Sequence, residues 1–76
     1  MVDTLADALP REIVRVSAKR DRWRNMMRDY PELAFGMGLT IKIMDAEIGR
    51  AVRACANGDV VEMLQSLEAL KGYDDD

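Results

Sequence analysis

The sequence predicts an all-α fold, either a three-helix antiparallel bundle or a helical hairpin, in one small domain over residues 1–76. Apolar residues recur at spacings of three and four along the chain, and Val, Ile and Thr nowhere alternate as a strand requires. Proline and glycine separate three such segments by short turns, which favours antiparallel packing of neighbouring helices. A hydrophobic content of 49% beside 33% charged residues is typical of folded rather than disordered chains.

The first predicted helix spans about residues 5–29 or 10–29. Pro10 suits a first-turn position, and Asp3 and Asp7 upstream are candidate N-caps. Tyr30 should end the helix, because the residue before a proline, here Pro31, is biased away from helical backbone angles.

One apolar seam runs along this first helix with a basic residue in its middle. The seam residues follow a heptad spacing: Leu9, Ile13, Val16, Arg20, Trp23, Met27 and Tyr30. A charge in an apolar seam costs stability unless it is paired or reaches water. Arg20 therefore either extends its guanidinium to solvent or sets the register of the helices, and both alternatives stay open.

The second predicted helix spans about residues 32–56 or 39–56, with a second seam at the same spacing: Ala34, Met37, Ile41, Met44, Ile48, Ala51 and Cys55. Gly36 and Gly38 make its start ambiguous, because each costs a helix about 1 kcal/mol relative to alanine. Either the helix begins after Gly38 with Thr40 as its cap, or the glycines lie inside it and let another backbone approach closely. We expect Cys55 to be a small buried hydrophobic residue.

The third predicted helix spans about residues 59–71. Gly58 should cap the preceding helix, and Asp59 with Glu62 three residues later forms an acidic variant of the capping box. Its apolar face is expected to comprise Val60, Met63, Leu64, Leu67 and Leu70. Residues 73–76 read as a solvated acidic tail.

The second helix carries a further apolar face opposite its seam. On a helical wheel this face comprises Leu39, Ile43, Ala46 and Ala54, and it is interrupted by Arg50. The other two helices could each cover one side of the second helix in a closed monomer, but they are short, so we predict a homodimer with Leu39, Ile43 and Ala46 at its interface. Trp23 is assigned either to that interface or to the core of a single chain, where it would be the largest apolar contribution.

Charge is distributed unevenly: residues 10–29 hold seven basic and three acidic side chains, whereas the whole chain has a net charge of −3. One side of the first helix gathers the predicted partner-binding residues Arg11, Arg15, Lys19, Arg22 and Met26. This side predicts docking on an acidic surface of another protein. The alternatives are a solvated face that pairs with the molecule's own carboxylates, and phosphate contact with nucleic acid. A pI near 4.8 disfavours the nucleic-acid alternative.

The absence of histidine and the single cysteine limit the chemistry of the chain. A histidine base, a disulfide within the chain and a zinc site are all disfavoured, so we expect no enzyme, no metal centre and no cofactor. The cysteine usage fits a reducing cytoplasm. No apolar run reaches the roughly 20 residues of a membrane span.

Two segments, "LADALPREIVRV" at 5–16 and "IGRAVRACANGDVVEMLQSLEALKG" at 48–72, resemble short early proteins of temperate, Mu-like bacteriophages. The resemblance implies a non-enzymatic, homodimeric inhibitor that binds a host bacterial protein in the host cytoplasm. The target class would be a transcription regulator, as for quorum-sensing anti-activators, or a defence component, as for anti-CRISPR proteins.

Two further alternatives stay open. The second and third helices could form a nucleic-acid-binding helix-turn-helix regulator, although the exposed residues expected on the last helix are poor for phosphate contact: Glu62, Gln65, Ser66, Glu68 and Lys71. The chain could also be an assembly factor that binds only itself.

Overall fold

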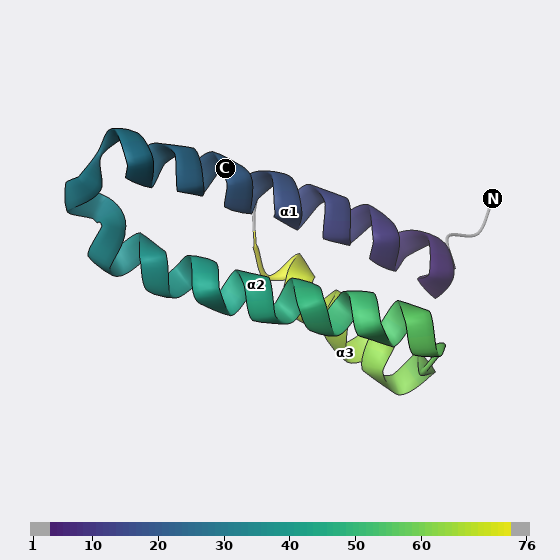
Figure 1. The fold of residues 1–76 in the computed structure, drawn as a ribbon. Helices are drawn as coiled ribbons and strands as arrows, with labels where there is room; N and C mark the ends of the chain where they lie inside the picture. Colours follow the sequence, from purple (N-terminus) through teal and green to yellow (C-terminus); the bar gives the residue numbers. More distant parts are fainter. Residues whose placement is uncertain (1–3, 74–76) are drawn as a thin grey trace.

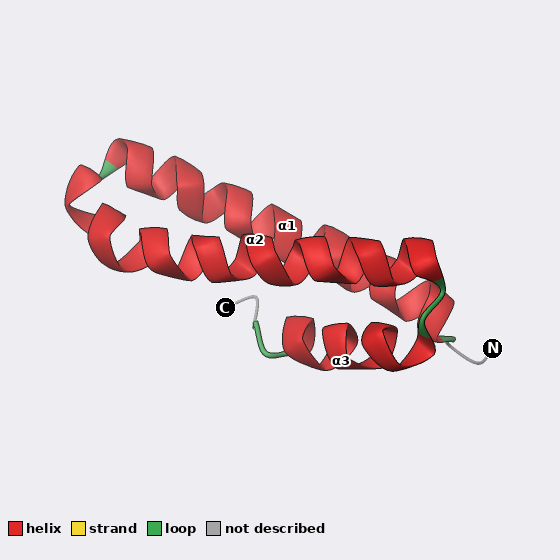
Figure 2. Ribbon diagram, turned by 60° about the horizontal axis from the view of Figure 1, so that its bottom comes forward, coloured by secondary structure: helices red, strands yellow, loops and turns green. Residues whose placement is uncertain are grey.

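The computed structural model describes residues 4–73, which form three α-helices and one short 3₁₀ turn and contain no strand (Figure 1). Helix α1 spans Leu5–Asp29, the 3₁₀ turn η1 spans Pro31–Leu33, α2 spans Ala34–Asn57 and α3 spans Val60–Lys71. The all-α prediction is confirmed. Figure 2 shows α1 and α2 as a long antiparallel hairpin, with α3 packed against one half of it.

Helix α1 starts at the earlier of its two predicted positions because Thr4 caps it. The Thr4 hydroxyl oxygen accepts the Asp7 main-chain N–H at 3.2 Å, and the hydroxyl donates to the Asp7 carboxylate at 2.8 Å. The prediction of Asp7 as the cap is therefore wrong, and Asp3 lies outside the described residues. Pro10 lies inside the helix rather than in its first turn. The helix tolerates it because only the hydrogen bond to Ala6, near the helix start, is lost.

The connection between α1 and α2 is a single 3₁₀ turn. Tyr30 follows the last residue of α1, as predicted from Pro31, and α2 begins at Ala34. Gly36 and Gly38 therefore lie inside α2, and the alternative start with Thr40 as cap is wrong. The Thr40 hydroxyl lies 3.4 Å from the Gly36 carbonyl oxygen instead.

The corner between α2 and α3 follows the predicted capping chemistry. Gly58 has a positive φ of 66°, a conformation that favours glycine, and its N–H donates to the Ala54 carbonyl at 3.0 Å. The Asp59 carboxylate accepts the Glu62 main-chain N–H at 3.1 Å. The corner thus turns α3 back along the hairpin.

The hydrophobic core lies where α3 covers the hairpin. Its buried residues come from all three helices: Leu9, Val16, Met44, Ile48, Ala51, Ala54, Met63, Leu67 and Leu70. Cys55 is half-buried beside this core, while Val60 and Leu64 of the predicted α3 face are exposed. Ser66 is buried instead of exposed, because it lies one turn from Met63 on the side of α3 that faces the hairpin.

The third helix is much shorter than the other two, so the hairpin extends past it. The end of α3 lies beside Arg15 of α1 and Glu47 of α2. From Arg15 to Asp29, α1 rises by about 21 Å that α3 does not accompany. Figure 2 shows this half of the hairpin with no third helix beside it.

Candidate protein-binding surface

Arg15, predicted to contact a partner, is engaged inside the molecule. Its guanidinium donates to the carbonyl oxygens of Leu70, at 3.0 Å, and Tyr73, and it pairs with Glu12 at 2.6 Å. The last carbonyls of a helix have no partner within the helix, and a cation is favourable at that end. Arg15 therefore fastens α3 to α1, and its role in partner binding stays a prediction.

Lys19 is also withdrawn from the surface. The residue is only 7% exposed, and its ammonium lies 5.6 Å from the centroid of the Trp23 ring. This distance is within reach of a cation–π interaction. Trp23 itself is half-buried and packs against the core of its own chain. Arg11, Arg22 and Met26 remain on the exposed side of α1.

Carboxylates of the same chain neutralise part of the basic segment. Arg20 forms an ion pair with Asp45 at 2.8 Å, and Arg24 bonds to the other oxygen of that carboxylate. Burial lowers the pKa of Arg20, but hydrogen bonds to Asp45 and Asp21 outweigh it and leave the pKa above its ordinary value. Arg20 is therefore paired across the helix interface, which answers how a charge is accommodated in the apolar seam.

The predicted second face of α2 is exposed except at one residue. Leu39, Ile43 and Ala46 are all exposed, whereas Ala54 is buried in the core where α3 packs, so its placement on an uncovered face is wrong. The dimer interface assigned to the three exposed residues stays a prediction. Trp23, assigned to the same interface, lies on the other helix and faces its own core.

The part of the hairpin that α3 covers stops at the C-terminal end of α3. Burial, together with a hydrogen bond to Glu47, raises the pKa of Tyr73 to about 12. Arg15 on α1 and Glu47 on α2 thus hold the two sides of this end. Glu47 Oε2 is buried and has no hydrogen-bond partner among the described residues.

Beyond this point the same faces of α1 and α2 continue with large apolar side chains. Helical spacing places Met26 on the side of α1 that carries Arg15, and Ile43 one turn before Glu47 on α2. Tyr30 directly follows the last residue of α1. Leu33 of η1 closes the tip. We call these four exposed residues, Met26, Tyr30, Leu33 and Ile43, the open end.

Sequence reasoning singles out two residues of the open end in other roles, Met26 as a partner-binding residue and Ile43 as a dimer-interface residue, and it misses Tyr30 and Leu33. The heptad spacing places Tyr30 in the buried seam, yet it is 56% exposed because the 3₁₀ turn leads the chain away there. Leu33 belongs to no periodic segment, so no signal in the sequence marks it.

The outer side of α2 carries a separate feature around Phe35. A hollow of about 370 Å³ lies there, lined by Ala34, Phe35, Gly38, Leu39 and Lys42. The sequence points to it only through the alternative that places Gly36 and Gly38 inside the helix, where they leave room for a close approach, and the exposed Phe35 beside Gly38 belongs to no periodic series.

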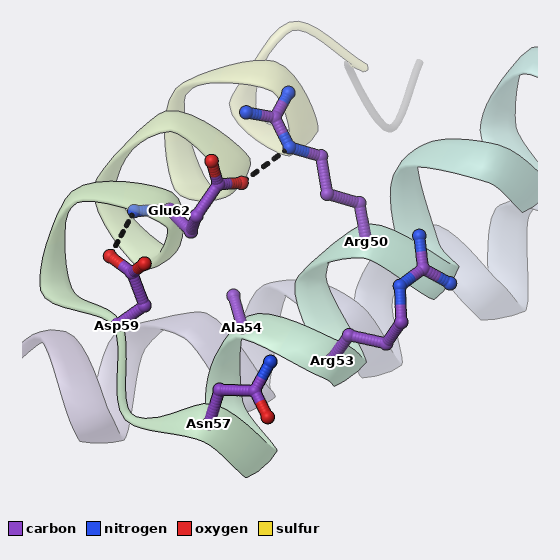
Figure 3. Close-up of a pocket in the computed structure, with 6 residues that line it drawn as sticks. All are labelled: Arg50, Arg53, Ala54, Asn57, Asp59 and Glu62. Atoms are coloured by element: carbon purple, nitrogen blue, oxygen red, sulfur yellow. Dashed lines mark hydrogen bonds and ion pairs between the residues drawn. The ribbon is translucent and has the colours of Figure 1, made fainter.

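A second hollow, at the α2–α3 corner, is crossed by partnered charges (Figure 3). Arg50 pairs with Glu62 at 2.8 Å and also donates to Gln65. The hydrogen bond to Glu62 is the main cause that raises the pKa of Arg50. Figure 3 shows Arg50 reaching from α2 toward Glu62 on α3, so this pair ties the two helices together.

Within residues 4–73, no group of three or more histidine, cysteine, aspartate or glutamate side chains is placed to hold a metal ion. None of the helices in that range has an apolar stretch long enough for a bilayer crossing. A comparison of the chain with protein families, with characterised proteins and with solved structures finds no match.

Proposed function

We propose that this protein is a non-enzymatic, phage-encoded inhibitor that binds a host bacterial protein, and that the open end is its contact surface. The observation that carries the proposal is the unequal length of the helices. The hairpin offers one continuous face, α3 covers half of it, and Met26, Tyr30 and Ile43 of the other half are exposed. The phage context rests on the resemblance of residues 5–16 and 48–72.

The occupant that fits this surface is an amphipathic helix of the host protein. Helix α3 demonstrates the mode of packing, because Met63, Leu67 and Leu70 bury one apolar side against both α1 and α2. A partner helix placed beyond Lys71 would continue along the same line. The stretch of α1 from Arg15 to Asp29, about 21 Å long, matches about 14 helical residues, or four turns, and Val16 and Lys19 within it are already buried.

The side chains of the open end suit recognition of such a helix. Tyr30 supplies an aromatic anchor with a polar tip, and Met26 supplies an adaptable apolar contact. We therefore expect the partner helix to carry three or four apolar residues on one side.

Inhibition would follow from occupancy, since a host helix held on the open end is not available to its normal partner. The helix-turn-helix alternative has less support, because Arg50 at the α2–α3 corner is already paired with Glu62. Exposed Glu68 on α3 also opposes phosphate contact.

A photo-crosslinking experiment in the bacterium that carries the gene tests this assignment. A photoreactive phenylalanine analogue replaces Tyr30 in one variant and Val14 in the control; Val14 is exposed on α1 away from the open end. We expect one dominant protein adduct from position 30 and none of that mass from position 14. The crosslinked peptide should map to an amphipathic helix of the host protein.

Loss-of-binding variants make the test quantitative. Ile43→Glu places a charge on the open end and should weaken capture of the crosslinked protein at least about tenfold, equivalent to about 1.4 kcal/mol. Val61→Glu, at an exposed apolar position on α3, should leave it unchanged. Equal capture by both variants, or a crosslink to nucleic acid, would contradict the proposal.

A further inference from the structure

We infer that a second copy of this chain docks on the outer side of α2, with the Phe35 ring of each copy seated in the hollow beside Gly38 of the other. This contact is distinct from the open end and does not depend on it. It would use Phe35, Gly38 and Leu39 from each copy.

Phe35 is a projecting apolar side chain with no contact to explain it. The residue is 97% exposed, the highest fraction among the exposed large hydrophobic residues of the described chain. It lies in the first turn of α2, where the backbone is held in a regular helix. An exposed phenylalanine leaves on the order of 200 Å² of apolar surface in water, which favours a partner that removes it.

Gly38 supplies the matching concavity. A Cβ atom added at Gly38 would meet nothing within 4 Å, so no packing inside the chain requires a glycine there. A glycine in a helix interior costs about 1 kcal/mol relative to alanine. A side chain at Gly38 would project into the hollow of about 370 Å³ between Phe35 and Lys42, so its absence leaves that space open.

The projecting Phe35 and the Gly38 beside the hollow lie three residues apart on α2, and this spacing suits a symmetric dimer. If two α2 helices cross antiparallel about an axis between residues 36 and 37, Phe35 of each copy falls opposite Gly38 of the other. The same axis brings Leu39 against Ala34 of the second copy. A two-fold contact of this kind is self-complementary, since every pairing occurs twice.

The positions of two opposite charges support this alignment of the two α2 helices. Lys42 lines one rim of the hollow, and the same axis places it beside Glu32 of the second copy. The two opposite charges occur twice in the dimer. A second copy necessarily brings both the projecting ring and the carboxylate at this spacing, whereas a foreign protein would have to carry the same pair.

The contact buries a small area, which limits the affinity of the dimer. Phe35, Leu39 and their neighbours bury a few hundred Å² per copy, below the roughly 800 Å² per partner of a stable interface. We therefore expect a weak dimer with a Kd of about 10–100 µM. Met26 and Tyr30 stay outside the contact, so the dimer leaves their side of the open end accessible.

Sedimentation velocity from about 1 µM to about 1 mM protein tests the inference. The unmodified chain should shift from monomer to dimer over this range. Phe35→Ala removes the ring and Gly38→Leu fills the hollow, so each should raise the Kd at least about tenfold while circular dichroism stays helical. Val14→Ala, at an exposed position on α1, should leave the Kd unchanged.

A charge exchange separates this register from any other dimer. Lys42→Glu alone should weaken the dimer, because the new carboxylate would then face Glu32 of the second copy, and adding Glu32→Lys should restore it. A chain that stays monomeric at about 1 mM overturns the inference. So does a dimer that Phe35→Ala and Gly38→Leu leave intact, or one that the double exchange fails to restore.

Discussion

The guanidinium of Arg15 on α1 donates a hydrogen bond across 3.0 Å to the carbonyl oxygen of Leu70, at the end of α3. The same side chain reaches the carbonyl of Tyr73 and is held in place by Glu12. One side chain thus joins the first helix to the last. It adds a charged donor at the end of α3, where the Leu70 carbonyl also accepts the Tyr73 main-chain N–H at 3.1 Å.

We predict that Arg15→Ala lowers the free energy of unfolding by about 1–3 kcal/mol, because hydrogen bonds from a charged donor are lost. Urea denaturation followed by circular dichroism measures the change. Arg53→Ala, an exposed arginine on α2, is the matched control and should stay within about 0.5 kcal/mol of the unmodified chain. An Arg15→Ala chain as stable as this control would show that the contact does not hold α3.

Asp45 should matter more than its exposure suggests, because it pairs with both Arg20 and Arg24. Asp45→Asn is expected to lower the free energy of unfolding by about 1 kcal/mol at low salt, and by less at about 1 M salt, where charges are screened. Glu68→Gln makes the same change of charge at an exposed position on α3. If both variants respond to salt alike, the pairing contributes nothing specific.

The alkaline stability of the protein should depend on Tyr73. Its pKa is raised to about 12, above the ordinary value of about 10, so the unfolded chain loses this proton first. The stabilisation is complete below about pH 10 and is lost as the pH rises through about 12. Tyr73→Phe should therefore lose less stability than the unmodified chain between these two pH values.

Urea titrations at a series of pH values measure this dependence, with Tyr30→Phe at an exposed position as the control. At neutral pH we expect Tyr73→Phe to cost about 1 kcal/mol, since Glu47 loses a hydrogen-bond donor. Parallel pH profiles for the unmodified chain and Tyr73→Phe would refute the assignment.

Gly36 and Gly58 should respond oppositely to alanine. Gly36 lies inside α2, and a Cβ atom added there meets nothing within 4 Å, so Gly36→Ala should raise the free energy of unfolding by about 1 kcal/mol. Gly58 has a φ of 66°, so Gly58→Ala should lower it by about 1 kcal/mol. Thermal and urea unfolding of the two variants check the pair, and a loss of stability in Gly36→Ala would indicate a close contact at that glycine.

Local chemistry in the sequence locates most of the helix ends. Pro31 after Tyr30 and the Gly58-Asp59 pair act through backbone angles and capping bonds that need only neighbouring residues. The start of α2 is harder to predict, because the cost of Gly36 and Gly38 competes with the continuation of the helix from a 3₁₀ turn. Hydrophobic periodicity alone does not decide whether α2 starts before or after the two glycines.

The surface is harder to predict than the helices, and the reason is where α3 ends. The wheel of the first helix places Arg15 and Lys19 on an exposed flank. Arg15 is half-buried because it bonds to the end of the third helix, and Lys19 is buried beside Trp23, and a wheel of one helix predicts the burial of neither. The second wheel correctly places Leu39 and Ile43 on an additional face of α2, whereas Phe35 escapes it because this residue belongs to no heptad series.

The order of the helices, with α3 after the hairpin, has a consequence during synthesis. Leu67 and Leu70 complete the core, so Leu9 and Val16 of α1 stay uncovered while the ribosome adds α3. At about 5–20 residues per second, the 12 residues of α3 require on the order of one second. During that interval the nascent hairpin exposes an apolar face along its whole length. A chaperone or a second nascent chain near the exit tunnel then has access to this face.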